Sequence, residues 1–190
     1  KRGRLGSHHV FRGPGVAMLE SLIFVVFPFC MAFAIVSDMV SMTIANRVSI
    51  VLVVSFALVA PLTGMAWADL GWHFAAGAMV LACTFVLFAI GGMGGGDAKL
   101  MAATALWMGF SPQLVEYLAL ASVLGGVLTL FLLVYRKSSL SVFTGGNMFL
   151  RHFADEKVGI PYGIALGAGG LMTYPATPLM QWALARLAAG

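Results

Sequence analysis

Long apolar runs separated by short polar stretches make up most of the chain. A helix that crosses a membrane needs about 20 mostly apolar residues, and several of these runs approach that length. The pattern predicts helices over residues 18–36, 48–68, 72–90, 99–110, 112–135 and 160–185. The last of these contains Pro175 and Pro178, and we expect them to kink or break it because proline lacks a backbone donor. The predicted fold is an all-α integral membrane protein, a polytopic bundle of about six transmembrane helices.

The first 17 residues do not share this pattern, since they are polar and rich in glycine. The apolar pattern opens directly at Met18. We interpret residues 1–17 as leader or added residues outside the fold, and residues 18–190 as a single membrane-embedded domain. His8 and His9 then belong to the excluded segment, and no metal site is expected there.

Composition agrees with a membrane protein. Of the 190 residues, 61% are hydrophobic and 9% are charged, against about 45–50% and about 25% in soluble domains. These values exclude a soluble enzyme, a disordered chain and a nucleic-acid-binding domain. Cys30 and Cys83 lie in apolar runs without a CxxC pair. We expect both to pack as small apolar side chains rather than to form a disulfide or a zinc site.

The loops predict an orientation. If each helix crosses once, segments 37–47, 91–98 and 136–159 fall on the same side. That side and its helix ends carry most of the basic residues, namely Arg47, Lys99, Arg136, Lys137, Arg151 and Lys157. The other side carries only Arg186 once residues 1–17 are excluded. The positive-inside rule therefore places this side in the cytoplasm, and the net charge of +4 fits that bias. Counting the basic residues of 1–17 would favour the opposite orientation.

Five of the seven acidic residues have structural interpretations, and they are Glu20, Asp69, Glu116, Asp155 and Glu156. Glu20 is expected in the first turn of the first helix, where the helix dipole favours an anion. Asp69 is expected to cap the helix that follows it. Ser111 and Pro112 have the pattern of an N-cap followed by proline, which puts Glu116 near the same boundary. The last two acids are expected to be solvated.

Asp38 and Asp97 differ from the other acids. Asp38 directly follows the first apolar run, and Asp97 ends the glycine-rich segment 91–96. The predicted topology places both on the same face of the membrane. Two neighbouring carboxyl groups do not both ionise easily, so they share a proton. One can then act as a base on water while the other acts as an acid toward a carbonyl group.

The helix that follows Asp97 is short for a membrane span. Residues 97–110 extend about 21 Å at 1.5 Å per residue, whereas the hydrocarbon core is about 30 Å thick. Either this helix does not span, or the glycine loop dips into the membrane and carries Asp97 below the surface. Glycine suits such a loop because it allows close backbone approach. The alternative is a flexible hairpin in which Asp97 only caps the helix.

Three segments resemble one protein family. Residues 94–99 (GGGDAK) look like the GxGD-x-K motif of the type IV prepilin peptidases, which are GxGD membrane aspartyl proteases. Asp38 with Thr43, Ile44, Asn46 and Arg47 resembles the first aspartate motif of that family, and residues 160–166 resemble its last-helix signature. Ala45 stands where the family usually has proline, which would loosen the turn. The chain also lacks the paired CxxC motifs of the N-methylation domain, as does the short form in tight-adherence (Flp) pilus systems, called CpaA or TadV.

The resemblance implies a role for several residues. Asp38 and Asp97 would be the catalytic pair, and Gly94 and Gly96 would shape the loop. Lys99 matches the motif lysine, and we expect it to extend to the surface near the substrate rather than to pair with Asp97, because residues i and i+2 do not face each other on a helix.

Other polar residues near the motifs are less specific. Asn46 and Arg47 are expected either to support the Asp38 loop or to anchor the helix at the membrane interface. The segment 138–157 has the pattern of an amphipathic surface segment, with a role in substrate docking as the alternative. His73 and His152 are expected to be interfacial.

The resemblance implies a membrane endopeptidase that removes a short leader from pilin or pseudopilin precursors. It would act on the cytoplasmic side of the bacterial inner membrane, with the lipid bilayer as its other partner and without nucleic acid. No cofactor or metal is expected, because no group of His, Cys and Glu has ligand spacing. Two alternatives remain open, a proton-coupled transporter with Asp97 in its pathway and a non-catalytic pilus assembly protein. The sequence does not predict the oligomeric state.

Overall fold

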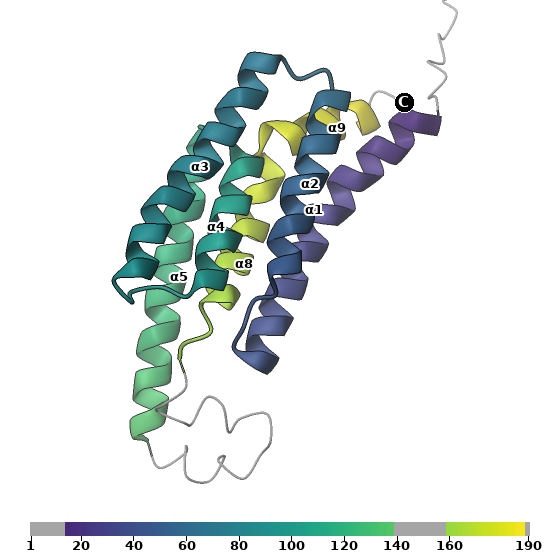
Figure 1. Ribbon diagram of the computed structural model, residues 1–190. Coiled ribbons are helices and arrows are strands. Elements are labelled where there is room, and N and C mark those ends of the chain that lie inside the picture. The colour runs from purple at the N-terminus through teal and green to yellow at the C-terminus, as the bar shows by residue number, and fades with distance from the viewer. Residues whose placement is uncertain (1–13, 139–158, 189–190) are drawn as a thin grey trace, which may run out of the picture.

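The computed structural model describes residues 14–138 and 159–188, and within them the chain forms helices and no strand. The helices run alternately up and down in Figure 1. They are α1 (Pro14–Ser41), α2 (Asn46–Leu62), α3 (Trp67–Ala89), α4 (Gly95–Met108), α5 (Pro112–Lys137), α8 (Tyr162–Thr173) and α9 (Pro178–Ala188), with the 3-10 turn η1 (Tyr174–Ala176) before α9.

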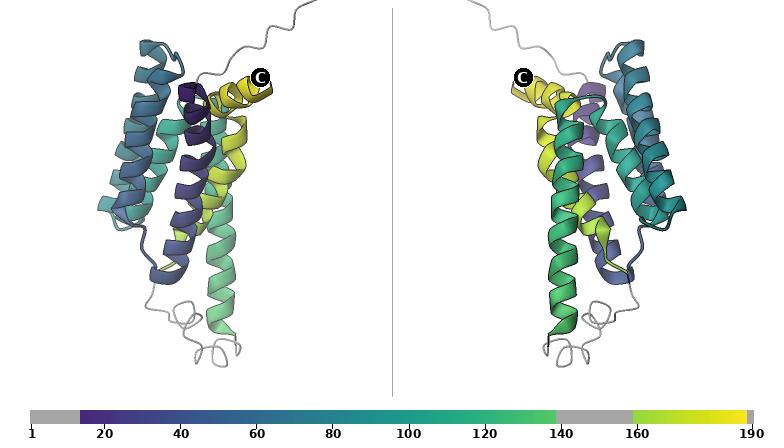
Figure 2. Two further views of the ribbon diagram at one scale, coloured as in Figure 1. Left: turned by 90° about the vertical axis from the view of Figure 1, so that its right-hand side faces the viewer. Right: turned by 90° about the vertical axis from the view of Figure 1, so that its left-hand side faces the viewer.

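Two helices occupy the centre of the arrangement. α4 packs most extensively against α3 and then against α2, while α8 lies between α1 and α5. α4 and α8 also contact each other. The side views in Figure 2 show α2, α3 and α4 on one side of α1, with α5 and α8 on the other. The short α9 crosses the upper end of the bundle in Figure 1, as expected from the prolines that end the preceding helix.

The prediction of a helical membrane protein is supported, but six spans are not confirmed. Among the described residues, three segments are long and apolar enough to cross a membrane: Met18–Ser41, Trp67–Ala89 and Pro112–Lys137. The apolar helix α2 is shorter, with 17 residues. α4 has 14 residues and α8 has 12, which correspond to about 21 Å and about 18 Å of helix.

α4 is buried by its neighbouring helices along most of its length, unlike an amphipathic helix at a surface. Every residue from Ala102 to Met108 is buried, together with Ala98 and Leu100. A helix that is apolar on all sides belongs in the interior of a bundle. α4 therefore does not need the length of a membrane span, because it packs against the neighbouring helices rather than against lipid.

Aromatic side chains join the central helices at the upper half of the bundle. The rings of Phe27 and Tyr174 stack at 4.1 Å, and Trp107 packs against both at 5.4 and 5.9 Å. The Trp107 indole donates a hydrogen bond to the Leu52 carbonyl (2.9 Å), and the Tyr174 hydroxyl donates one to the Ile23 carbonyl (2.7 Å). The polar groups of Trp107 and Tyr174 are thus both satisfied, and the cluster ties α1, α2, α4 and η1 together.

A stripe of glycines on α8 allows α1 to approach closely, as the spacing of Gly163, Gly167 and Gly170 predicts. A Cβ atom built on Gly167 would lie 2.5 Å from Ile35 Cγ1 and 2.9 Å from the Met31 carbonyl oxygen. At Gly170 it would lie 3.0 Å from Met31 Sδ. No side chain fits between the two helices here without moving them apart.

The structure corrects the expectation for several individual residues. α1 begins at Pro14, so Glu20 lies beyond its first turn and is buried. α3 begins at Trp67, which puts Asp69 in the first turn and Ala66 at the N-cap. His73 is buried rather than interfacial, because it bonds to the Leu106 carbonyl (2.8 Å) and stacks on Phe56.

Two further expectations hold only in part. Ser111 occupies the N-cap position of α5 with Pro112 after it, but its hydroxyl makes no capping hydrogen bond. Cys30 is buried as expected, whereas Cys83 is exposed on the surface of the bundle.

The contact between α1 and α8 predicts a large difference between two glycine substitutions. Gly167→Ala should destabilise the protein by about 1–3 kcal/mol, the usual effect of an atom forced into a packed interface. Gly126→Ala on α5 is the matched control, because a Cβ atom there meets nothing within 4 Å. Thermal unfolding in detergent measures both variants. Equal melting temperatures for the two would contradict the close packing described here.

Candidate functional site

The chain segments that carry the sequence motifs meet at one end of the bundle. The end of α1 and the starts of α2, α4 and α8 lie together at the lower end in Figure 1. Asp38 comes from the last turns of α1 and Asp97 from the first turn of α4. The prediction that these two residues lie on the same face of the bundle therefore agrees with the observed topology.

Asp38 is held in place by the first turn of α8. Its side chain is 4% exposed, and its Oδ2 atom accepts a hydrogen bond of 2.6 Å from the backbone N–H of Gly163. A Cβ atom at position 163 would lie 2.8 Å from that same oxygen. Glycine is required here because the carboxyl group occupies the space that any side chain would need.

The chain leaves α1 through a tightly bonded turn. Met42 adopts a φ of 51°, and its N–H bonds to the Asp38 carbonyl. The hydroxyls of Ser37 and Ser41 both bond to the Thr43 carbonyl. Ala45, which stands where the family usually has proline, has φ −65°, the angle that a proline ring imposes. The backbone at position 45 thus has the conformation of a proline residue, although alanine stands there.

Asp97 lies at the N-terminus of α4, where the backbone dipole favours a negative charge. Its carboxyl group folds back onto the glycine loop, since a Cβ atom at Gly94 would lie 2.7 Å from Asp97 Oδ2. The backbone of Gly94 donates a hydrogen bond to this carboxyl group. Gly94 and Gly163 thus share one requirement: at each position the backbone contacts a carboxyl group directly, and a side chain would occupy the same space.

Ile44 connects the two motifs. A Cβ atom at Gly96 would meet the Ile44 carbonyl at 3.2 Å and its Cβ at 3.3 Å, and one at Gly163 would meet its Cδ1 at 2.8 Å. The Ile44 side chain is buried and so lies between the first turns of α4 and α8. The contacts of Ile44 with Gly96 and Gly163 leave no room for a side chain at either glycine. Ile44 therefore sets the spacing between the first turn of α4, which carries Asp97, and the first turn of α8, which holds Asp38.

The two aspartates interact electrostatically. α4 is not one of the three segments long enough to span a membrane. Burial of the Asp97 carboxyl and the charge of Asp38 raise the pKa of Asp97 to about 6, against the smaller opposing effect of the Gly94 hydrogen bond. Asp97 is therefore neutral below about pH 6 and charged above it. This is the behaviour of a carboxyl group that can hold a proton near neutral pH.

The basic residues of the site differ in their contacts. Lys99 is exposed, and its Nζ atom donates a hydrogen bond of 2.9 Å to Asn46 Oδ1, which joins the start of α4 to the start of α2. Arg47 is exposed on the first turn of α2. The predicted surface segment 138–157, including His152, lies outside the described residues except for Ser138.

Sequence reasoning did not identify the groups that position α8. The Tyr162 hydroxyl lies 3.2 Å from the Thr129 hydroxyl on α5, and Arg136 donates a hydrogen bond to the Gly159 carbonyl. These contacts fix the start of α8 and hence the Gly163 N–H. The family-like segment 160–166 pointed to this region, but a backbone donor leaves no signal in a sequence.

Fold and site together define a helical membrane protein with two interacting, largely enclosed aspartates at one end of its bundle. Among the described residues, no three His, Cys, Asp or Glu side chains lie close enough to hold a metal ion. A model of the Type IV leader peptidase family matches residues 25–130, and the chain belongs to this family. The match includes both aspartates and ends before α8. No curated protein and no solved structure matches the chain.

Family membership has direct consequences for function. The protein is a leader peptidase-like protease, and therefore a hydrolase. The family implies a pilin precursor as the substrate and an enzyme embedded in the membrane, in agreement with the three long apolar helices.

The electrostatic interaction predicts that Asp38→Asn lowers the pKa of Asp97, because the neighbouring negative charge is removed while burial remains. Carbon NMR of protein labelled at aspartate, in detergent micelles, measures this pKa. Asp69→Asn is the control, since Asp69 is exposed on the first turn of α3 and should leave the titration of Asp97 as it is. An unchanged Asp97 pKa in Asp38→Asn would contradict the interaction.

Proposed function

We propose that the protein is an aspartic endopeptidase that uses Asp38 and Asp97 to remove the leader from Flp-type pilin precursors. The observation that carries this proposal is the electrostatic interaction of the two carboxyl groups at the joined ends of α1 and α4. A shared proton between two carboxyl groups provides both a base and an acid in one site.

The proposed reaction needs only these two groups and water. Asp38, oriented by the Gly163 N–H, takes a proton from water as the water oxygen attacks the carbonyl carbon of the peptide bond. Asp97, whose raised pKa keeps it protonated to higher pH, gives its proton to the carbonyl oxygen. The tetrahedral intermediate then collapses: one of its hydroxyl groups returns a proton to Asp97, the C–N bond breaks, and the leaving nitrogen takes the proton that Asp38 holds, so both carboxyl groups regain their starting state. No covalent enzyme intermediate forms.

The distribution of basic residues supports a cytoplasmic active site in the bacterial inner membrane. Of the described basic residues, Arg47, Lys99, Arg136 and Lys137 lie at helix ends on the side of the aspartates, and Arg186 lies on α9 at the opposite end. Positive residues are enriched on the cytoplasmic side of membrane proteins. The leader of the precursor would then be cut on that side.

The proposal predicts that Asp38→Asn and Asp97→Asn each abolish cleavage without unfolding the protein. The assay mixes purified protein in lipid vesicles with a pilin precursor whose leader ends in glycine, and mass spectrometry identifies the products. Loss of a group that acts in the transition state should reduce the rate by about 10³-fold or more. EDTA should leave the wild-type rate unchanged, because the proposed step uses two carboxyl groups.

Matched variants separate the possible outcomes. Asp69→Asn removes an exposed carboxyl group at the other end of the bundle and should cleave as the wild type does. Full activity in either Asp38→Asn or Asp97→Asn would rule out the proposed pair. Binding of the precursor without turnover by the wild type would instead support a non-catalytic assembly protein.

A further inference from the structure

The first turn of α8 lies between two long helices, with α1 on one side and α5 on the other. Tyr162 and Gly163 are the first two residues of this turn. Successive residues on a helix are rotated by about 100° from each other, so Tyr162 faces α5 while Gly163 faces Asp38 on α1. A contact that holds Tyr162 on α5 therefore also determines where the Gly163 N–H lies.

This turn needs contacts of its own because it is the end of a helix. Helix ends fray more readily than helix interiors. Gly167 and Gly170 hold the middle of α8 against α1, but both lie at least one turn away from Gly163. The position of the Gly163 N–H therefore depends on what α8 contacts at its start.

The Tyr162 ring lies directly against the backbone of α5. A Cβ atom built on Gly125 would lie 3.3 Å from the ring atom Cδ1 and 3.4 Å from Cε1, so a larger residue there would press the ring away. Further along α5, Arg136 donates a hydrogen bond to the Gly159 carbonyl. α5 thus contacts the chain on both sides of Pro161, the residue that precedes α8.

Two hydroxyl groups connect Tyr162 to α5 in a fixed order. The Thr129 hydroxyl donates its single proton to the Gly125 carbonyl at 2.7 Å. Its oxygen lies 3.2 Å from the Tyr162 hydroxyl and is left to accept, so Tyr162 is the donor of that bond. Both contacts are partly buried, and a hydrogen bond that is shielded from water is stronger than one that is not.

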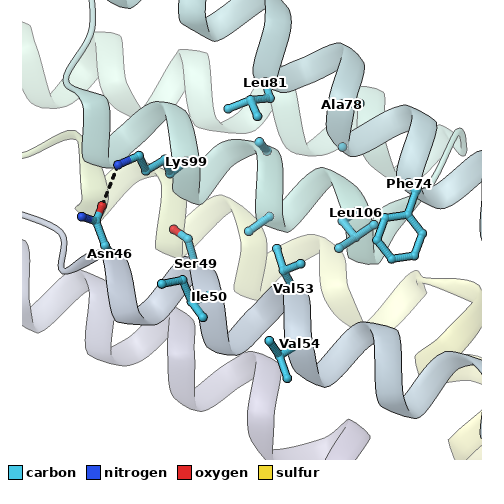
Figure 3. A pocket seen from close by; sticks show the side chains of 13 residues that line it. Asn46, Ser49, Ile50, Val53, Val54, Phe74, Ala78, Leu81, Lys99 and Leu106 are labelled. Atoms are coloured by element: carbon cyan, nitrogen blue, oxygen red, sulfur yellow. Dashed lines mark hydrogen bonds between the residues drawn. The ribbon is translucent and has the colours of Figure 1, made fainter.

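Another polar contact near the aspartates, the hydrogen bond between Lys99 and Asn46, differs in its surroundings (Figure 3). Both side chains are exposed, and they line a groove of about 560 Å³ between α2 and α3 that neither aspartate lines. An exposed contact contributes little because water competes for both groups. The partly buried contact of Tyr162 with Thr129 is therefore better suited to hold an aspartate segment in place.

We propose that Tyr162 and Thr129 are positioning residues for the reaction, an inference that rests on the proposed function. They hold the first turn of α8 on α5, and this keeps the Gly163 N–H 2.6 Å from Asp38 Oδ2. A hydrogen bond weakens steeply as its geometry departs from the optimum, so a small movement of the turn releases the carboxyl group. Asp38 then loses the orientation in which it activates water.

The test removes one hydroxyl group at a time. Tyr162→Phe keeps the ring, and Thr129→Val keeps the shape of the side chain. Loss of one intramolecular hydrogen bond changes an equilibrium by about fivefold, so each variant should lower kcat by about that factor and leave KM unchanged. The double variant should fall no further than the larger single effect, because both changes remove the same bond. Cleavage of a precursor with a glycine-ended leader, in lipid vesicles, measures both constants.

Two control variants isolate the bond. Thr129→Ser keeps the accepting oxygen and should restore the wild-type kcat. Ser122→Ala removes another α5 hydroxyl, which donates to the Leu118 carbonyl one turn back as Thr129 does to Gly125, and it should cleave as the wild type does. A raised KM with the wild-type kcat in Tyr162→Phe would make Tyr162 a substrate contact and would overturn the inference.

A second measurement does not depend on cleavage. Tyr162–Gly163 is the only Tyr–Gly pair in the chain, so labelling tyrosine with carbonyl carbon-13 and glycine with nitrogen-15 selects the Gly163 amide in an NMR spectrum. The chain has no Phe–Gly pair, and labelled phenylalanine therefore gives the same selection in Tyr162→Phe. The chemical shift of this amide proton reports its bond to Asp38, and Asp38→Asn gives the shift with an uncharged acceptor.

Tyr162→Phe and Thr129→Val should both move the Gly163 amide shift toward its value in Asp38→Asn, whereas Ser122→Ala should not. This result supports the positioning of Gly163 even if the wild type shows no cleavage, in which case the proposed function alone fails. A lower melting temperature with an unchanged Gly163 amide would show a purely structural role and would overturn the inference. In an active enzyme, the wild-type kcat in both variants would overturn it as well.

Discussion

The hydrogen bond between the Gly163 N–H and the Asp38 carboxyl depends on how closely α8 approaches α1, and much of the site depends on this approach. The bond joins residues 125 positions apart. It forms only because the α8 surface facing α1 consists of glycine at positions 163, 167 and 170, where any Cβ atom would meet α1 or Asp38. In an environment without a hydrophobic driving force between helices, such close contact is a main source of association.

The same principle places the second aspartate. α4 is enclosed by its neighbours, and its glycine-rich start lets Ile44 lie against Gly96 while the Asp97 carboxyl contacts Gly94. Glycine at these positions thus allows close contact between chain segments, and its role there is not to make the backbone flexible. Both carboxyl groups lie in direct contact with backbone at glycine positions, and the proposed catalytic pair depends on this arrangement.

The space between α2 and α3 is open because the two helices contact α4 rather than each other. Both helices pack on α4 but hardly on each other, so the bundle is dense around α1, α4 and α8 and open beside α2. The dense part holds the aromatic cluster around Trp107, whereas the open part between α2 and α3 is a groove lined mainly by apolar side chains. The two sides of the bundle therefore differ in packing, because α4 and α8 contact their neighbours closely while α2 and α3 hardly contact each other.

The sequence by itself determined where most helices lie, the order of the motifs and the end of the bundle at which Asp38 and Asp97 lie, because apolar runs and the alternation of helices follow from local pattern, whereas the six predicted spans are not confirmed. It also predicted the glycine face of α8 and the break at Pro175. It did not reveal the burial of Glu20 and His73, the Gly163 donor, the bond between Lys99 and Asn46, or the groove beside α2. Those features depend on which helices are neighbours and how closely they approach, and that is decided by packing between residues far apart in the chain.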